Sequence, residues 1–366
     1  MIRLASVLLC SCVLASGQPG LNHVATYPLP EGTHRPEIMT LPNGGFMVVV
    51  VQPDNQQGVG RIKHRAYRLD GSFNLVAEPF PVTRITAEYG EPADHRATIV
   101  NGELAVVYQS LVFPDGGPPP GGPAENFALE QSLMLARFTL DGKELDRRPI
   151  VAHQRDFSED NFPDFCILWR GDRLLAGTGS LSPKFKIREV TLDGAVPATH
   201  ILQSSPSGIG GTLGNSLYHD GSQLFVFSAT EPQNGALAIT ALDADFRPVK
   251  TIRFTDAGRE QNFPVGNFSA GRGLYVAYIS HPRGGPPDLL QNPYFPYLKI
   301  LNQGFEMQQD FQVGEGAGFS HVHPAVIGVG NRLLVAWSKA VNHGAMQAPQ
   351  VQIEEYSSSH PRDGRR

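Results

Sequence analysis

The chain has 366 residues, of which 18% are charged and 41% are hydrophobic, and its formal net charge is −5. Such a weakly acidic balance disfavours nucleic acids and anionic membrane surfaces as partners. The 39 glycines and 30 prolines suit many short strands joined by turns, so the composition favours an all-β protein.

The beginning of the chain has the pattern of an export signal. Arg3 supplies a positive charge, an apolar run follows, and the small residues Ala-Ser-Gly at 15–17 form a cleavage site. We therefore expect residues 1–17 to be a signal peptide and the mature protein to be secreted or periplasmic. Cys10 and Cys12 leave lipidation as an alternative, although no small residue stands directly before Cys10. No later stretch approaches the roughly 20 apolar residues that a membrane-spanning helix needs.

Six times along the chain, a turn that contains glycine precedes an apolar run. In most units a later strand ends at Leu-Asp-Gly or a related turn, as in YRLDGS, FTLDGK and VTLDGA. Each unit therefore predicts four antiparallel strands, a to d, with tight turns from a to b and from c to d. The marker glycines recur at the uneven intervals that are typical of propeller blades with loop insertions: Gly44, Gly102, Gly171, Gly221, Gly271 and Gly330. The predicted fold is an all-β, six-bladed β-propeller of four-stranded antiparallel blades, formed by residues 18–356 as one domain.

The two ends of the chain predict how the ring closes. The sixth unit reaches strand c at residues 350–356, and the serine-rich tail 357–366 that follows is expected to be disordered. Residues 23–29 have the alternation of a d strand, so we expect the N-terminal strand to complete the last blade and leave no open sheet edge. Cys166 is the single cysteine after the signal, so strand pairing and not a disulfide must hold the closure. We expect a monomer.

The first unit resembles a known repeat. It runs from THRPEIMTLPNGGFMVVVV through YRLDGS to FPVT and is similar to the unit of secreted bacterial repeat β-propellers, which reads QxxPxVAxLxDGGFVVVW, then QRFDxxGxxxG, then EFQVN. QNFP at 261–264 and DFQVG at 310–314 match other pieces of that pattern. The resemblance implies a propeller fold and export. It implies no activity, because the wider group has no shared catalytic set.

The longest and most varied connections are the d-to-a and b-to-c loops, which open on one face of a propeller. The b-to-c loops of the second and fifth units, residues 112–126 and 281–297, are rich in proline and glycine, so we expect shaped walls there, with flexible loops as the alternative. Each strand a begins on the same face, nearest the axis. The six starts read Thr33-His34-Arg35, Asp94-His95-Arg96, Asp160-Asn161-Phe162, Leu213-Gly214-Asn215, Gln261-Asn262-Phe263 and His321-Val322-His323.

Polar side chains at these starts predict a ring around one mouth. Strands that converge from separate parts of a sequence can build a polar pocket, which we expect to bind a glycan or another small molecule. The alternative is structural, because polar residues at blade starts often bond the backbone of the preceding connection. The predicted ligand-binding residues are His34, Arg35, Arg96, Asn161, Asn262 and His323, with His281 and Arg283 from the fifth unit's loop.

A polysaccharide-degrading enzyme is the alternative function for the same ring. A lyase would use a histidine and a tyrosine as general acid and base, while the arginines of the ring neutralise a uronate carboxylate. A glycoside hydrolase would use paired aspartates. The catalytic candidates for these roles are His95, His321, Asp94, Asp160 and Tyr89.

We expect neither a metal nor a cofactor. Histidines 34, 95, 321 and 323 all stand in the ring, but no HxxxH or other compact ligand spacing joins them. The sequence also has no GxSxG and no CxxC, and its glycine runs do not join a strand to a helix as a phosphate-binding loop would.

Overall fold

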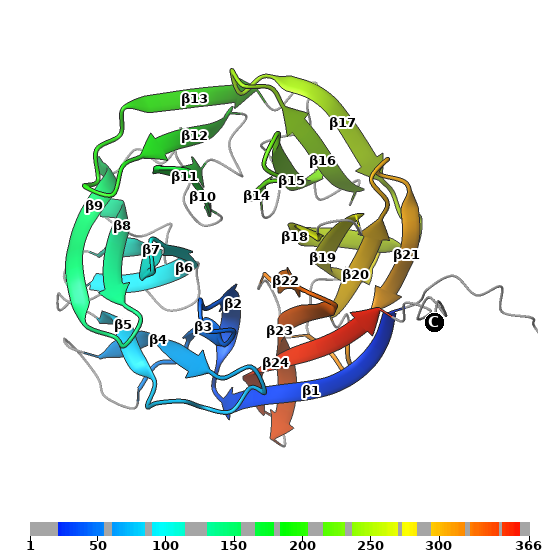
Figure 1. Cartoon of the computed structure of the whole chain (residues 1–366), viewed down its shortest axis with the longest axis horizontal. Coiled ribbons are helices and arrows are strands. Elements are labelled where there is room, and N and C mark those ends of the chain that lie inside the picture. Colours follow the sequence, from blue (N-terminus) through cyan, green and yellow to red (C-terminus); the bar gives the residue numbers. More distant parts are fainter. Residues whose placement is uncertain are drawn as a thin grey trace, which may run out of the picture.

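The structure is a computed structural model, and it describes residues 21–54, 61–84, 90–113, 130–154, 165–178, 184–203, 215–230, 236–269, 273–283, 294–318, 323–343 and 346–358. Over these residues the chain forms six four-stranded antiparallel sheets and no helix. The sheets stand around a central axis like the blades of a propeller (Figure 1). The predicted six-bladed β-propeller is therefore confirmed. A search of these residues finds no helix long and apolar enough to cross a membrane.

Each blade is numbered from the strand nearest the axis to the strand at the perimeter (Figure 1). Blade one is β2 (His34–Thr40), β3 (Phe46–Val51), β4 (Ile62–Leu69) and β5 (Phe80–Arg84). Blade two is β6 (Gly90–Val100), β7 (Glu103–Val112), β8 (Glu130–Thr139) and β9 (Glu144–Gln154), and blade three is β10 (Cys166–Arg170), β11 (Arg173–Thr178), β12 (Lys184–Val190) and β13 (Ala198–Gln203). Blade four is β14 (Asn215–His219), β15 (Leu224–Thr230), β16 (Ala236–Leu242) and β17 (Pro248–Phe254). Blade five is β18 (Arg259–Ser269), β19 (Gly273–Pro282), β20 (Phe295–Leu301) and β21 (Met307–Gln312). Blade six is β22 (Ala325–Val329), β23 (Arg332–His343), β24 (Met346–Ser358) and β1 (Leu21–Glu31).

The ring is closed by pairing between the two ends of the chain. β1 is antiparallel to β24 from Leu21 opposite Ser358 to Glu31 opposite Gln350. The N-terminal strand therefore supplies the missing fourth strand, as predicted, and β24 continues slightly beyond its predicted end. Just after β1, the Thr33 hydroxyl donates to the Pro30 carbonyl at 2.6 Å and accepts from the Val351 amide at 3.1 Å, which ties blade one to blade six.

The apolar core lies between neighbouring blades, because each b strand buries both of its faces. In β3, Phe46 and Val48 belong to one cluster with Leu334 of blade six, whereas Met47 belongs to another with Val106 of blade two. All of these side chains are fully buried. The closed ring thus needs no disulfide, and the only cysteine in the described residues, Cys166, is buried and forms none.

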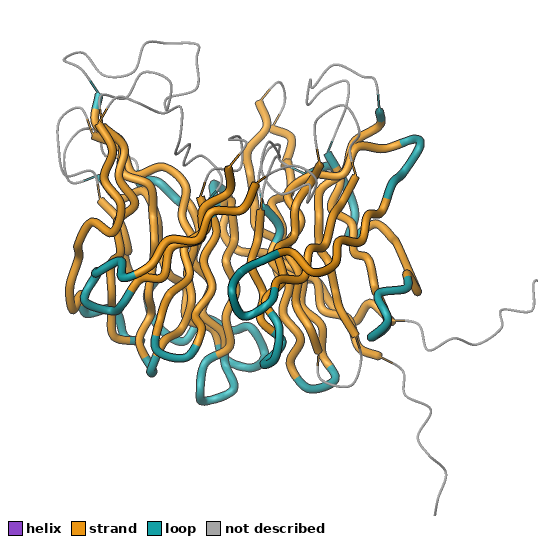
Figure 2. Tube along the Cα trace, turned by 90° about the horizontal axis from the view of Figure 1, so that it is seen from above, coloured by secondary structure: helices purple, strands orange, loops and turns teal. Residues whose placement is uncertain are grey.

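The Leu-Asp-Gly landmark forms the turn between the two outer strands of a blade. In the first copy the Asp70 carboxylate accepts the backbone amides of Ser72 and Asn74, at 2.8 and 2.9 Å. Asp243 accepts two amides in the same way in the fourth blade, although that copy has lost its glycine. The described a-to-b and c-to-d turns gather along one edge of the ring (Figure 2), so the starts of the a strands lie at the opposite edge.

The predicted signal peptide lies outside the described residues, as do most of the two proline-rich loops and the tail from residue 359. Export, the boundaries of the domain and the monomeric state stay predictions. Membership of the bacterial repeat family also stays a prediction, because the six-bladed architecture does not test the repeat motifs themselves.

Deletion of residues 18–30 tests the closure. The deletion removes most of β1 and leaves β24 as an unpaired edge, so we expect the melting temperature to fall and aggregation to increase. Thermal unfolding measured by circular dichroism checks this result. The matched control removes residues 359–366, beyond the end of β24, and should leave the melting temperature unchanged. A deletion of β1 that melts like the full chain would contradict this account of closure.

Candidate functional site

Irregular backbone at the starts of β2 and β6 brings the side chains of Arg35 and Asp94 together. The register of β2 slips between His34 and Glu37, and that of β6 slips between Pro92 and His95. A bulge of this kind bends a strand and redirects its side chains. Arg35, inside the first bulge, has a left-handed backbone with φ of 53°, which is uncommon for a residue with a side chain. Its amide donates to Ser338 Oγ of blade six at 3.0 Å, which holds this conformation.

Four charged side chains from blades one and two form a cluster, which we call the axial cluster: Arg35, Glu37, Asp94 and Arg96. Arg35 Nη1 lies 3.1 Å from Asp94 Oδ1. Arg96 Nη1 lies 3.5 Å from Asp94 Oδ2 and 3.5 Å from Glu37 Oε1, so one nitrogen bridges the two carboxyl groups. The Asp94 and Arg96 side chains are only 4% and 9% exposed, whereas Glu37 and Arg35 are 21% and 33% exposed. Asp94 and Arg96 thus form the buried part of the cluster, and Glu37 and Arg35 form the part that is open to solvent.

Asp94 has a different role from its counterparts in blades one and five. Thr33 occupies the corresponding position in blade one and bonds the Pro30 carbonyl, and Gln261 in blade five donates to the Phe254 carbonyl at 3.1 Å. Both are the structural bonds that polar residues at blade starts were expected to make. Asp94 instead holds two guanidinium groups and accepts the amide of His95 at 2.9 Å. The Asp94 carboxylate therefore positions two charged side chains in addition to bonding a backbone amide of its own strand.

The two carboxyl groups of the axial cluster differ in their affinity for protons. Burial raises the pKa of Glu37 to about 7, and the charge of Asp94 acts in the same direction, while Arg96 opposes both. Burial also works against ionisation of Asp94, but Arg96 and Arg35 outweigh it and hold the pKa of Asp94 well below its usual range. Near neutral pH Asp94 is therefore ionised, whereas Glu37 keeps its proton to a higher pH than an ordinary glutamate does.

His34 and His95 are neutral at physiological pH. Burial, followed by the charges of Arg35 and Lys63, lowers the pKa of His34 to about 3. Burial likewise lowers the pKa of His95 to about 4, although the charge of Asp94 opposes it. His95 is completely buried, with Nε2 3.3 Å from the Val49 carbonyl, so it packs between blades. In this position it does not reach solvent, and its catalytic role stays a prediction.

Blades five and six extend the polar region. Phe263 and His323 lie edge to face with ring centroids 4.7 Å apart, which joins the start of blade five to that of blade six. The charge of His323 contributes to the lowered pKa of Asp94, so blade six lies close to the axial cluster. Asn262, next to Phe263, is 7% exposed. His323 thus connects the start of blade five, through Phe263, with Asp94 of blade two.

The two predicted ligand-binding residues of the fifth unit lie at the end of β19 and directly after it. His281 lies on β19 and not in the loop; it is 7% exposed, forms an ion pair with Glu260 at 3.1 Å and packs on Tyr294. It is part of the interior of blade five because β19 continues to Pro282. Arg283 is exposed, and its amide donates to the Gly258 carbonyl at 2.9 Å. The candidates Tyr89, Asp160, Asn161 and His321 lie outside the described residues. Among the residues that are described, no group of three or more potential ligands could hold a metal ion.

Sequence reasoning missed Glu37. The six starts were aligned on the proline that follows them, and Glu37 comes directly after Pro36, at the variable position of the PxV pattern. The corresponding residues of blades five and six are Val265 and Ala325. The available signal was a carboxylate directly after the proline, which blade three shares in Asp164.

Replacing Glu37 with Gln tests its raised pKa. Glu37 binds its proton more tightly in the folded state than in the unfolded state, so protonation stabilises the fold. This contribution is complete below the ordinary pKa near 4.5 and is lost as the pH rises through about 7. The glutamine cannot ionise, so the variant lacks this loss. When the pH rises from 4 to 8, the unfolding free energy of the parent chain should therefore fall by about 3 kcal/mol more than that of the variant. Urea unfolding at both pH values measures this difference. The exposed Glu78 is the control, and E78Q should follow the parent; equal pH profiles for E37Q and E78Q would contradict the assignment.

Comparison with known proteins gives likeness of fold. No family model and no curated protein matches the sequence. Among solved structures, the chain is similar to the Bacteroides ovatus xyloglucan PUL protein GH43B, with a TM-score of 0.48 and 10% identity over 89% of this chain and 71% of that one. It is also similar to the Trypanosoma rangeli sialidase, with a TM-score of 0.48 and 9% identity over 88% and 53% of the two chains. The Cellvibrio cellulosa α-L-arabinanase gives a TM-score of 0.45 and 10% identity over 76% and 95%.

Proposed function

We propose that the chain is a glycan-binding propeller whose axial cluster receives a carboxylate-bearing sugar. The observation on which the proposal depends is the balance of charge among four side chains. Two guanidinium groups share the ionised carboxylate of Asp94, while burial shifts the fourth group, Glu37, toward its neutral form by raising its pKa to about 7. The cluster is therefore positive on average at neutral pH and more positive below it.

Geometry makes this charge available to a ligand. Arg35 is one-third exposed, and Asp94 fixes its guanidinium from below at 3.1 Å. A guanidinium that is already oriented loses less entropy when it forms paired hydrogen bonds with a carboxylate. The low pKa of His34 is partly due to Arg35 and Lys63, which indicates a positive field over the start of blade one. These features favour an anion over a cation.

The surrounding polar groups favour a sugar acid over a simple anion. Asn262 on β18 carries both donors and an acceptor in its side-chain amide. Hydroxyl groups use donors and acceptors equally well. A polar ring around a charged centre therefore suits a uronate, with its carboxylate on Arg35 and its hydroxyls toward the other blades.

Calorimetric titration with oligogalacturonate tests the proposal, and the fully methyl-esterified oligomer is the matched neutral ligand. We expect the acid to bind and the ester to bind much more weakly. Arg35→Ala should lower the affinity for the acid by about 10- to 100-fold, the usual effect of losing a hydrogen bond between charged groups. Arg247→Ala is the control because Arg247 is an exposed arginine in the tight turn between β16 and β17.

The pH dependence gives a second criterion for the same titration. Glu37 ionises as the pH rises through about 7, and the axial cluster then loses its positive excess. Affinity for the acid should therefore fall between pH 6 and pH 8 in the parent chain and change less in the E37Q variant. Equal affinity for acid and ester, or an unchanged affinity in R35A, would contradict the proposal.

Glycoside hydrolysis is the second candidate, and one observation favours it. Glu37 is 21% exposed with a pKa near 7, and the ionised Asp94 shares Arg96 Nη1 with it. A neutral carboxylic acid near an ionised carboxylate is the combination that glycosidases use as acid and base. Asp94 is 4% exposed and bonded to two arginines, which makes it a weak base. If E37Q abolishes release of reducing sugar but keeps affinity, hydrolysis replaces binding as the function.

A further inference from the structure

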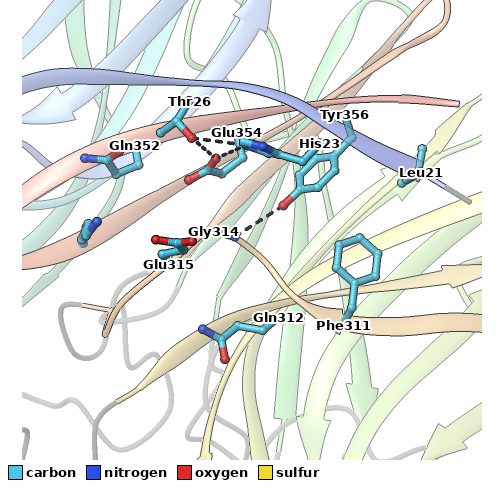
Figure 3. A pocket seen from close by; sticks show the side chains of 11 residues that line it. Leu21, His23, Thr26, Phe311, Gln312, Gly314, Glu315, Gln352, Glu354 and Tyr356 are labelled. Atoms are coloured by element: carbon cyan, nitrogen blue, oxygen red, sulfur yellow. Dashed lines mark hydrogen bonds and ion pairs between the residues drawn. The ribbon is translucent and has the colours of Figure 1, made fainter. Parts of the chain in front are cut away.

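A cavity with polar and apolar walls lies at the perimeter of the ring, away from the axial cluster. It has a volume of about 570 Å³ and lies between the outer strand β21 of blade five and the closing strands β24 and β1 of blade six. β21 and β1 are at the outside of the ring, whereas β2 and β6 are next to the axis (Figure 1). In Figure 3, Phe311 and Gln312 lie on one side of the cavity and Tyr356 and Glu354 on the other.

One wall of this perimeter cavity is fixed by close packing. Gly314 follows β21 with a left-handed φ of 63°, and a Cβ at this position would lie 2.5 Å from Glu354 Oε1 and 3.0 Å from the Trp337 ring. Its amide donates to the Tyr356 hydroxyl at 3.4 Å. The chain therefore packs directly against blade six at Gly314, which fixes this wall of the cavity.

The buried carboxylate in this cavity is fully used by the protein. Glu354 is 2% exposed and accepts bonds from His23 Nε2 at 2.8 Å, Thr26 Oγ1 at 2.6 Å and Trp337 Nε1 at 3.3 Å. The three groups resemble a hydrolase triad, but the Thr26 hydroxyl and the Glu354 carboxylate approach the same nitrogen of His23. A relay needs the two different nitrogens, so this arrangement supports structure and binding and not nucleophilic catalysis.

The groups that remain at the rim of the cavity have opposite hydrogen-bonding requirements. Lys339 only donates, Glu315 only accepts, and the amide of Gln312 does both. Gln352 is buried, and its amide nitrogen already donates to Gln350 Oε1 at 3.0 Å. A cationic ligand would be repelled by Lys339, and an anionic ligand by Glu315 and Glu354. A neutral ligand with several hydroxyl groups satisfies all of them, because each hydroxyl both donates and accepts.

We propose that this perimeter cavity binds a neutral sugar. Phe311 is partly buried and lies edge to face with Tyr356, with ring centroids 5.7 Å apart, so the cavity also offers apolar ring surface to the C–H groups of a sugar ring. Cavities of a few hundred Å³ with aromatic walls and a few polar groups are typical of small-ligand sites. The ligand class differs from the acidic sugar of the axial cluster, so the two proposals stand independently.

Occupation of the cavity would also reinforce closure of the ring. Leu21, His23 and Thr26 come from β1, while Gln312 and Glu315 come from blade five and the segment after it. A ligand in contact with both parts binds only the closed ring, and binding to the folded state alone raises the melting temperature. Thermal stabilisation by a neutral sugar is therefore a second readout.

The experiment is saturation-transfer NMR on the full chain with a panel of neutral disaccharides, namely cellobiose, xylobiose, maltose and lactose. We expect at least one of them to bind saturably and to raise the melting temperature. The double variant Q312A/E315A alters two exposed side chains, so it should fold normally and weaken that binding by at least tenfold. Gln308, exposed on the same strand and outside the cavity, is the matched control, and Q308A should bind like the parent.

Arg35→Ala separates this proposal from the one for the axial cluster. The variant should leave affinity for the neutral disaccharide unchanged even though it weakens binding of oligogalacturonate. The proposal is overturned if no member of the panel binds saturably, if Q312A/E315A binds like the parent chain, or if R35A abolishes binding of the neutral sugar.

Discussion

Closure of the ring is the constraint on which the rest of the structure depends. Each blade buries its apolar b strand against the next blade, so the last blade must meet the first or one interface stays open. Pairing of β1 with β24 meets this requirement between opposite ends of the sequence, as the contact between His23 and Glu354 shows. The polar ends of the a strands converge only because the ring is complete.

The axial cluster buries charged groups, which is unfavourable for folding, and this cost indicates a role beyond stability. Burying Asp94 would be strongly unfavourable without the guanidinium groups of Arg35 and Arg96. Arg35 reaches Asp94 only through a bulge and an uncommon backbone conformation. Strain of this kind is retained where the surrounding structure or a function requires it. Blades one and five show that a threonine or a glutamine suffices for the local backbone at the same point, so stability alone does not explain the charged set.

The architecture was predictable because its signals are local. Turns such as Asn-Gly-Gly and Leu-Asp-Gly and the apolar runs beside them depend on neighbouring residues only, and they define all six blades. The pairing of β1 was predictable from a missing strand at one end and a spare strand at the other. By contrast, the slip in register that turns Arg35 toward Asp94 has no local signature. The sequence shows two His-Arg pairs but not which carboxylate they meet.

Individual site residues were predicted less well for the same reason. His281 stands at the edge of a proline-rich segment, but β19 extends far enough to include it and Glu260 holds it inside the blade. Glu37 was overlooked because its importance comes from Arg96, which belongs to the next blade and is distant in sequence. The perimeter cavity joins residues from both ends of the chain, and nothing in their sequence neighbourhoods connects them.

The use of the N-terminal segment as the last strand has a consequence for the order of folding. The first strand to be synthesised is also the one that must wait longest, because its partner β24 is made at the other end of the chain. Until then both edges of the incomplete ring are open to pairing with other chains. Contacts of such high sequence separation also slow folding. The folding chain is therefore open to association with other chains until its last strand has paired.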